Sequence, residues 1–453
     1  MIAPARLAAY DVLRAVSSGR ADLPTALARV RARLPDERDR ALAGEIATGA
    51  LRWQGAFDVV IAAFAGRPAA KLDPEVLDVL RLTAFQLLHL DRVPASAAVN
   101  DAVNLASKAG KKSASGLVNA VLRRISRERS RLPLPPRPDA SGDRADAIAY
   151  LSSTLSHPQW LVTRWLDRHG FEAAESWARF DNGPAAFTLR VNTLRTSREA
   201  LAASLETHGV VTEPTRFAPQ GLVVRSGNPL LTPLAAGGLF LVQDESSQLV
   251  ALLTAVAPGE RVLDACASPG GKTTAMAAAM ENRGLIVATD VRGLRVDLLA
   301  RTVRAAGTTC VRIVQADAAH ALPFGKRFDC VLLDAPCSGL GTLRRDPDIR
   351  WRRTEASLPA LAAVQLAMLG RTADAVEPGG RLIYATCSSE PDENEEVVSR
   401  FLADRPDFSH TPSRLPDGLQ RFVGTDGYFR TFPFRDQLEP FFAAMLVKTK
   451  DLR

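Results

Sequence analysis

The sequence predicts an α/β protein: a doubly wound parallel sheet near the C-terminus, preceded by an all-α bundle and a small α+β module. After Val250, short apolar runs alternate with helical stretches, which is typical of strands buried on both faces by crossover helices. The first 135 residues instead repeat apolar residues at helical spacing, with few Gly or Pro inside the runs. Between these regions the pattern is mixed.

The chain is long enough for several domains. Its 453 residues are 46% hydrophobic and 24% charged, as in ordinary globular proteins. From the usual size of protein domains, a chain of this length is expected to form two or three of them. Pro133, Pro135, Pro136 and Pro138, followed by Ala-Ser-Gly-Asp, form a stretch that neither helix nor sheet tolerates. We therefore expect a helical domain over residues 1–135, a linker over 136–147, a small module over 148–250 and the sheet domain over 251–453.

The helical domain carries the basic charge of the chain. Its residues include 21 Lys and Arg against 13 Asp and Glu, whereas the rest of the chain has 36 against 37. The last helix, residues 115–125, has one apolar face and a cationic end that includes Arg123 and Arg124. A localised positive field favours a polyanionic partner, nucleic acid before membrane, because no lipid-anchor pattern accompanies it. Surface solubility is the alternative explanation.

The two later regions show alternating strands and helices. In the small module, strand-like runs at 186–191 and 221–225 flank a helical stretch at 198–208, which predicts a ferredoxin-like or RNA-recognition-like module. In the sheet domain, the expected strands are residues 261–266, 285–290, 311–314, 331–334 and 381–385, and the expected helices are 274–280, 295–305 and 358–375.

The fourth of these strands presents a carboxylate and a thiol. It must end at Pro336, because proline lacks the ladder donor and restricts the residue before it. Asp334 and Cys337 therefore emerge at the carboxyl end of the strand, where open α/β sheets bind their ligands. Alone, this pattern is equally consistent with a strand cap beside a core cysteine.

A glycine-containing loop follows the first strand. Gly271-Lys-Thr resembles the end of a P-loop, but that motif needs a glycine where this chain has Cys266, which disfavours an NTPase. A nucleoside fits better, because Gly270 and Gly271 let the backbone approach a ligand. A nicotinamide enzyme would share this geometry, but the loop lacks the full Gly-x-Gly-x-x-Gly.

Two aspartates support the nucleoside interpretation. Asp290 ends the second strand about twenty residues after the loop, a position suited to ribose hydroxyls, although it could equally cap a turn. Asp317 follows the third strand and could accept from an adenine amino group.

Two cysteines decide the predicted chemistry. Cys337 and Cys387 each follow one of two adjacent strands, so we expect both thiols in one crevice beside the nucleoside pocket. Attack by a thiolate on carbon 6 of cytosine makes an enamine whose carbon 5 can accept a methyl group. A base must then remove the carbon 5 proton before the thiol leaves.

The cysteines also indicate a reducing compartment. All five lie after residue 265 and none forms a Cys-x-x-Cys pair, which disfavours a disulfide framework or a metal site. The N-terminus lacks a signal-peptide layout and no apolar run reaches membrane-spanning length. We expect a cytoplasmic, metal-free protein that acts as a monomer.

Several motifs resemble known RNA-modifying proteins. Arg6-Leu-Ala-Ala-Tyr, Val93-Pro-Ala-Ser-Ala and Leu117-Val-Asn-Ala-Val are similar to NusB-type RNA-binding domains. Asp264-Ala-Cys-Ala-Ser-Pro-Gly-Gly-Lys-Thr, Asp334-Ala-Pro-Cys-Ser-Gly and Ala385-Thr-Cys-Ser resemble RNA 5-methylcytosine methyltransferases, as does Arg344-Arg-Asp-Pro-Asp-Ile-Arg-Trp. Together they resemble the RsmB branch, whose members methylate a cytosine of 16S ribosomal RNA.

This resemblance implies a class I methyltransferase with a Rossmann-like sheet and a NusB-like front domain. It implies Cys387 as the nucleophile and Cys337 as the residue that assists release, with Lys272 and Asp334 placing the cytosine. The residues implied to bind S-adenosylmethionine are Cys266, Ala267, Ser268, Pro269, Gly270, Gly271, Lys272, Asp290, Asp317 and Asp334. The side chains expected to contact RNA are Arg123, Arg124, Arg344, Arg345 and Arg350.

The sequence is compatible with more than one nucleic-acid substrate. The catalytic motifs are compatible with ribosomal RNA, transfer RNA or DNA as the substrate. Only the resemblance of the N-terminal domain favours ribosomal RNA or an early small-subunit assembly intermediate. A non-catalytic NusB-like RNA-binding factor is a further alternative, against which the intact cysteines and glycine loop count. Residues 438–442 lack the usual Asp-Gly before the paired aromatics, which leaves the final strand uncertain.

Overall fold

The computed structural model describes residues 2–139, 143–325, 327–413, 415–416 and 418–450. It divides into two compact units: unit 1 comprises residues 1–184 and 343–355, and unit 2 comprises residues 185–342 and 356–453. This division differs from the predicted boundaries. The first part of the predicted small module belongs with the helical bundle, and so does a short segment from within the predicted sheet domain.

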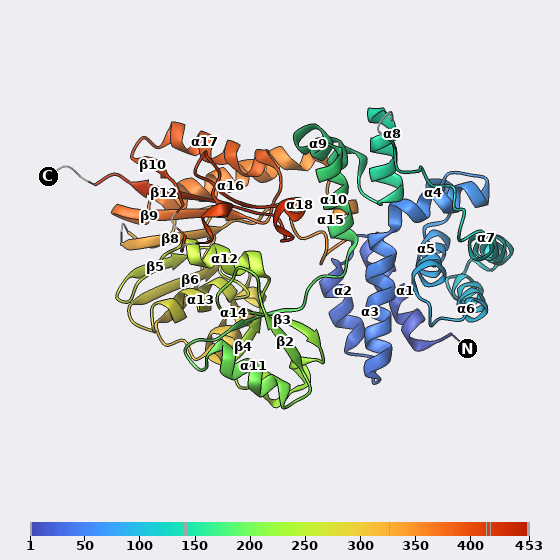
Figure 1. The fold of residues 1–453 in the computed structure, drawn as a ribbon, viewed down its shortest axis with the longest axis horizontal. Coiled ribbons are helices and arrows are strands. Elements are labelled where there is room, and N and C mark those ends of the chain that lie inside the picture. The colour runs from blue at the N-terminus through green and yellow to red at the C-terminus, as the bar shows by residue number, and fades with distance from the viewer. Residues whose placement is uncertain (1, 140–142, 326, 414, 417, 451–453) are drawn as a thin grey trace. The chain divides into compact units, whose positions relative to one another are not determined.

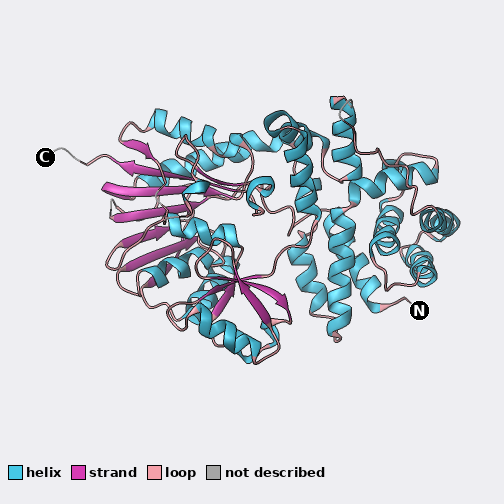
Figure 2. Ribbon diagram, in the orientation of Figure 1, coloured by secondary structure: helices cyan, strands magenta, loops and turns pink. Residues whose placement is uncertain are grey.

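Unit 1 begins with the predicted helical bundle, whose described residues form helices and connecting turns (Figures 1 and 2). Its helices are α1 (Pro4–Ser17), α2 (Leu23–Arg31), α3 (Glu37–Arg52), α4 (Gln54–Ala65), α5 (Pro74–His89), α6 (Ala95–Lys108) and α7 (Ser115–Arg127). One apolar core joins them, because each buries aliphatic residues at helical spacing. Asp22 caps α2 by accepting from the Thr25 N–H at 2.9 Å, which fixes where that helix begins.

Further helices complete unit 1. They are α8 (Arg144–Ala149), the π-helical turn η3 (Tyr150–Thr154), α9 (Gln159–His169), α10 (Phe171–Asn182) and the short α15 (Ile349–Arg352). Trp165 of α9 stacks on Trp177 of α10, with ring centroids 4.6 Å apart. Within the predicted linker, Arg137 donates to Glu175 of α10 at 2.8 Å, so this residue is tied to the unit. Predicted linker residues 140–142 lie outside the described residues.

Unit 2 begins with a small antiparallel sheet in the order β2-β3-β1-β4. Its strands are β1 (Thr188–Val191), β2 (Val211–Pro214), β3 (Gly221–Ser226) and β4 (Phe240–Val242), and helix α11 (Arg198–Glu206) packs against it. The predicted strands and helix of this module are confirmed, and β2 and β4 add to them.

The large sheet of unit 2 is the predicted doubly wound sheet, with strand order β10-β12-β9-β8-β5-β6-β7 and β11 paired to β12. The strands are β5 (Arg261–Asp264), β6 (Leu285–Asp290), β7 (Val311–Gln315), β8 (Phe328–Asp334), β9 (Val376–Thr386), β10 (Phe408–Thr411), β11 (Phe429–Thr431) and β12 (Phe441–Lys448). Strands β5 to β9 pair in parallel, whereas β12 pairs antiparallel with β9. The uncertain final strand therefore exists and begins at the paired aromatics.

Helices cover both faces of this sheet (Figure 1). On one face lie α12 (Glu245–Leu253), α13 (Gly271–Ala279) and α14 (Gly293–Ala306), and on the other α16 (Leu358–Ala373) and α17 (Glu395–Asp404). The short helix α18 (Pro433–Asp436) connects β11 and β12, and the turn η7 (Pro391–Glu393) lies between β9 and α17. The strand order reverses between β5 and β8, and the carboxyl ends of strands at such a switch point are where open α/β sheets bind their ligands.

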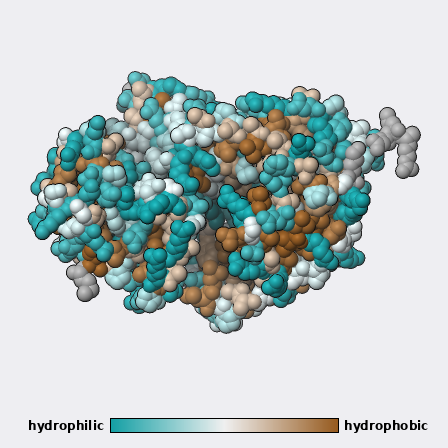
Figure 3. All heavy atoms as spheres, turned by 180° about the vertical axis from the view of Figure 1, so that it is seen from behind, coloured by the Kyte–Doolittle hydropathy of each residue, from teal (hydrophilic) through white to brown (hydrophobic). Residues whose placement is uncertain are grey.

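The surface is mixed in polarity. In the view of Figure 3, hydrophilic residues cover much of the visible face and apolar residues form separate patches. Among the described helices, none is both long enough and apolar enough to cross a membrane.

Candidate active site

The two predicted catalytic thiols meet at the carboxyl ends of β8 and β9. These strands pair in parallel with Asp334 opposite Ala385, and the Ala335 N–H donates to the Ala385 carbonyl at 2.8 Å. Cys337 and Cys387 follow directly, and their Sγ atoms lie 3.3 Å apart. We predicted that the two thiols meet because each follows one of two adjacent strands. The structure brings them together as predicted.

A buried carboxylate holds the two cysteine loops together. Glu393, which is 0% exposed, accepts hydrogen bonds from the N–H and hydroxyl of Ser338 and from the hydroxyl of Ser388. Gln365 of α16 donates to the same carboxylate at 2.9 Å. Ser338 and Ser388 are the residues next to Cys337 and Cys387, so this carboxylate fixes the backbone that carries both thiols. No motif in the sequence pointed to Glu393 as a site residue.

An ion pair lies on the glycine-loop side of the thiols. Lys272 donates from Nζ to Asp334 Oδ2 at 2.7 Å, and its ammonium lies 5.5 Å from the centre of the Phe441 ring. Burial lowers the pKa of Lys272, but the charge and hydrogen bond of Asp334, together with the Cys387 sulfur, outweigh burial and leave that pKa raised. The lysine is therefore an ammonium at neutral pH, within electrostatic range of Cys387.

The Cys337 thiol is held in its protonated form. Its hydrogen bond with Cys387, its burial, and the nearby charges of Cys387 and Glu393 all raise the pKa of Cys337 well above that of a free cysteine. Cys337 is thus suited to donate a hydrogen bond as a thiol rather than to act as a thiolate.

The glycine loop after β5 is tightly built. Gly270 has φ +104°, and a Cβ there would lie 3.0 Å from Leu299 of α14, so the loop accepts only glycine at this position. Helix α13 begins at the next residue, Gly271, which leaves the N-terminal amides of the helix beside the loop. Burial raises the pKa of Cys266, whose thiol therefore stays protonated.

Carboxylates follow the neighbouring strands in spatial order. Asp334, the glycine loop, Asp290 and Asp317 lie at the carboxyl ends of β8, β5, β6 and β7, respectively. Asp290 Oδ1 accepts from the Arg292 N–H at 3.2 Å, and Asp317 Oδ1 accepts from the Ala319 N–H at 2.9 Å, so each aspartate uses one oxygen to cap a turn. A glycine cradle flanked by acceptors for hydroxyl and amino groups fits a nucleoside.

Asp264 is a buried site residue to which the sequence motif alone assigns no role. It ends β5, is 1% exposed, and accepts from the Thr273 hydroxyl at 2.7 Å. Burial raises the pKa of Asp264 to about 7 despite that hydrogen bond, and the charge of Asp334 adds to the rise. The signal available in the sequence was an acidic residue inside an otherwise apolar strand end.

The arginines predicted to contact RNA divide into two groups. Arg123 and Arg124 are exposed on α7, where Arg123 borders a groove between α6 and α7 with a volume of about 750 Å³. Ser96, Asn100, Asn119 and Arg127 also line this groove, so it combines cationic and amide groups.

The second group lies in the segment 343–355 of unit 1, and here one expectation is corrected. Arg350 is 1% exposed, and its guanidinium donates to the carbonyls of Arg52, Ser156 and Asp181 and to Asn182 Oδ1 at 2.8–3.1 Å. It is therefore a structural residue and offers no surface to a phosphate. Arg344 and Arg345 are partly exposed, and Arg344 lies over the Phe180 ring and donates to the Pro184 carbonyl.

Family profiles match all three predicted regions. One described as 16S rRNA methyltransferase RsmB/F matches residues 251–447, one described as the NusB family matches residues 3–127, and one described as an RsmF/B-like, ferredoxin-like domain matches residues 157–230. The predicted NusB-like domain and ferredoxin-like module are thereby confirmed.

Curated relatives extend over nearly the whole chain. A protein of Synechocystis sp. named "Probable ribosomal RNA small subunit methyltransferase B" is 36% identical, covering 98% of this chain and 99% of the relative. "Ribosomal RNA small subunit methyltransferase B" of Pseudomonas putida is 35% identical, covering 94% and 97%.

Two solved structures are similar to this chain, one over nearly its whole length and one over about two thirds of it. The structure of PH0851 superposes with a TM-score of 0.81 at 27% identity and covers 99% of both chains. A methyltransferase homologue from Pyrococcus horikoshii has a TM-score of 0.56 at 28% identity, covering 67% of this chain and 99% of the other.

Proposed function

We propose that this chain, which belongs to the RsmB/F family of 16S rRNA methyltransferases, methylates carbon 5 of a cytosine in small-subunit ribosomal RNA through a covalent cysteine–cytosine intermediate. S-adenosylmethionine is the cofactor of this family, and it supplies the methyl group as an electrophile on a sulfonium. The single observation that carries the cytosine chemistry is the 3.3 Å separation of the Cys337 and Cys387 sulfurs beside the Lys272–Asp334 ion pair.

The proposed reaction begins with Cys387. Its thiolate, which accepts a hydrogen bond from the Cys337 thiol, forms a bond to carbon 6 of the cytosine and turns the ring into an enamine. Carbon 5 then takes the methyl group. The Lys272 ammonium lies close enough to Cys387 to stabilise the thiolate before attack.

The roles of Lys272 and Asp334 follow from the chemistry of the base. The cytosine exocyclic amine and ring nitrogen 3 form a donor and acceptor pair, and a carboxylate beside an ammonium complements both. We assign Asp334 to the amine and Lys272 to the developing negative charge on the ring.

Release completes the cycle. The carbon 5 proton passes to solvent water, and the bond between carbon 6 and Sγ of Cys387 breaks. The sulfur leaves as the starting thiolate, and the Cys337 thiol assists its departure by donating a hydrogen bond to it.

We further propose that unit 1 recruits the RNA. The basic excess of the first 135 residues and the exposed Arg123 and Arg124 favour a phosphate-rich partner. The names of the relatives favour small-subunit ribosomal RNA, either free or in an early assembly intermediate.

Denaturing gel electrophoresis with RNA and S-adenosylmethionine tests the assignment of the thiols. Cys387→Ala should form no covalent adduct and show no turnover. Cys337→Ala should attack and transfer methyl but release product poorly, leaving a denaturant-resistant protein–RNA complex.

Cys310→Ala is the matched control, because Cys310 is a buried cysteine outside the crevice, just before β7. It should behave as wild type. A stable adduct from Cys387→Ala and none from Cys337→Ala would show that the two roles are reversed. Adducts from neither variant, with turnover retained, would refute the covalent route.

A further inference from the structure

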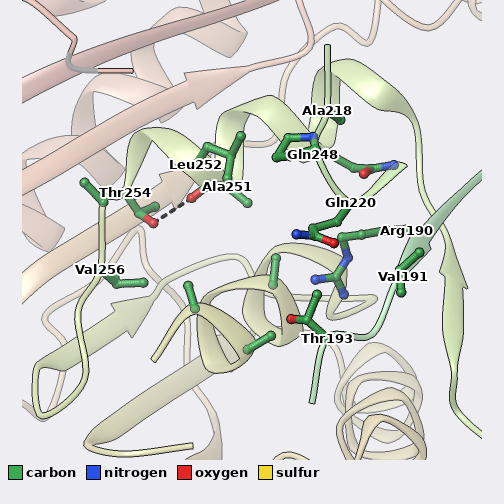
Figure 4. A pocket seen from close by; sticks show the side chains of 15 residues that line it. Arg190, Val191, Thr193, Ala218, Gln220, Gln248, Ala251, Leu252, Thr254 and Val256 are labelled. Carbon is green, nitrogen blue, oxygen red and sulfur yellow. Dashed lines mark hydrogen bonds between the residues drawn. The ribbon is translucent and has the colours of Figure 1, made fainter. Parts of the chain in front are cut away.

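Unit 2 contains a second pocket, lined by none of the residues assigned above to the active site (Figure 4). Its volume is about 310 Å³, and it lies between the small sheet and the helices α12 and α13. Strand β1 and the turn 218–220 form one side, and Ala251, Leu252, Ala275 and Ala278 form much of the other. Small molecules bind preferentially in such clefts between domains.

A buried cation lines this pocket. Arg190 of β1 is 5% exposed, and its Nη2 donates to the Thr274 hydroxyl of α13 at 2.6 Å. Its Nε is buried without a hydrogen-bond partner, and no carboxylate among the described residues pairs with it. Burial lowers the pKa of Arg190 to about 10, so it remains charged at neutral pH. A buried charge without a counter-ion is unfavourable and calls for an anion.

An unused acceptor lines the same pocket. Gln248 of α12 is 4% exposed, and its Nε2 donates to the Gln243 carbonyl at 3.0 Å and faces the Leu189 carbonyl at 3.5 Å. These contacts fix the orientation of the amide, and the buried Oε1 is left without a partner. A few polar groups in a largely apolar lining are what a small-molecule site uses to orient its ligand.

We propose that this pocket binds a small carboxylic acid with an apolar body, whose carboxylate pairs with Arg190. A planar carboxylate matches the fork of a single guanidinium, whereas a phosphate carries more charge and would need further donors. The alanine-rich walls take the apolar body, and a hydroxyl or amino group on the ligand can donate to Gln248.

Calorimetry and ligand-observed NMR on the full chain test this proposal with benzoate as the probe and benzamide as its uncharged isostere. A ligand of this size should bind with a dissociation constant on the order of 1 mM. Benzoate should bind at least tenfold more tightly than benzamide. Arg190→Met should remove this preference, whereas Arg225→Gln, an exposed arginine of β3 in the same sheet, should keep it.

Ala278→Leu gives an independent reading if Arg190→Met fails to fold. It narrows the pocket and leaves Arg190 in place, so benzoate affinity should fall at least fivefold. The proposal is overturned if benzoate and benzamide bind equally or not at all, or if benzoate binding survives Ala278→Leu unchanged.

Discussion

The buried carboxylate of Asp264 makes unit 2 less stable as the pH rises toward neutrality, and Asp264→Asn should remove that dependence. The pKa of Asp264 is raised from 3.8 to about 7 in the folded chain, chiefly by burial. The folded state therefore binds more protons than the unfolded state between these values. Stability contributed by the protonated form is fully present below about pH 4 and is lost as the pH rises through 7.

The magnitude follows from the shift. Each unit of pKa difference corresponds to about 1.36 kcal/mol, so the full loss is about 4 kcal/mol. Between pH 5 and pH 8, two of these units are lost, or roughly 3 kcal/mol. Asparagine has the shape of the neutral acid and can still accept from the Thr273 hydroxyl. The stability of Asp264→Asn relative to wild type should thus increase by roughly this amount over that range.

Urea denaturation at pH 5 and pH 8, followed by circular dichroism, measures this difference. All five tryptophans lie in unit 1, so their fluorescence does not follow unit 2. Asp297→Asn, an exposed carboxylate of α14, is the matched control and should leave the pH dependence as in wild type. Equal pH dependence in Asp264→Asn and wild type would refute the reasoning.

Three further outcomes are expected. Glu393→Gln should lower kcat about tenfold or more, because both cysteine loops lose a charged acceptor and hydrogen bonds to a charged group contribute about 1.5–3 kcal/mol. The affinity for S-adenosylmethionine, measured by calorimetry, should change little, and the control Glu396→Gln, exposed on α17, should retain activity. Arg123 and Arg127 line the groove between α6 and α7, and we expect both to contact phosphates. Replacing both with Gln should reduce the slope of log binding constant against log salt concentration by about 1.4, and an unchanged slope would show that RNA does not bind in this groove. Naked RNA or an early assembly intermediate should be methylated faster than finished subunits, because extruding a paired base costs a few kcal/mol; equal rates of methyl incorporation would contradict this.

The strands that carry the site could be predicted because each has a local signal. The apolar run before Asp334 ends at a proline, and the glycine loop follows a similar apolar run, so both strands and the residues at their ends could be predicted from the chain alone. The meeting of Cys337 and Cys387 could be predicted for the same reason, since both follow neighbouring parallel strands. Glu393 could not, because its partners Ser338 and Gln365 come from elements 55 and 28 residues away.

Arg350 shows that the composition of a segment does not tell which of its arginines are exposed and which are buried. The segment 344–353 contains five arginines, and nothing in their charge separates one that faces solvent from one that is buried. Arg350 is enclosed because its four acceptors come from α3, from the turn before α9 and from the end of α10, between 168 and 298 residues away in sequence. Trp351 beside it donates to the Leu51 carbonyl at 2.7 Å. These contacts hold the segment 343–355 within unit 1. A guanidinium buried in carbonyls cannot be replaced by lysine, which lacks the planar fork, so the arginine is required here for structure rather than for its charge toward RNA.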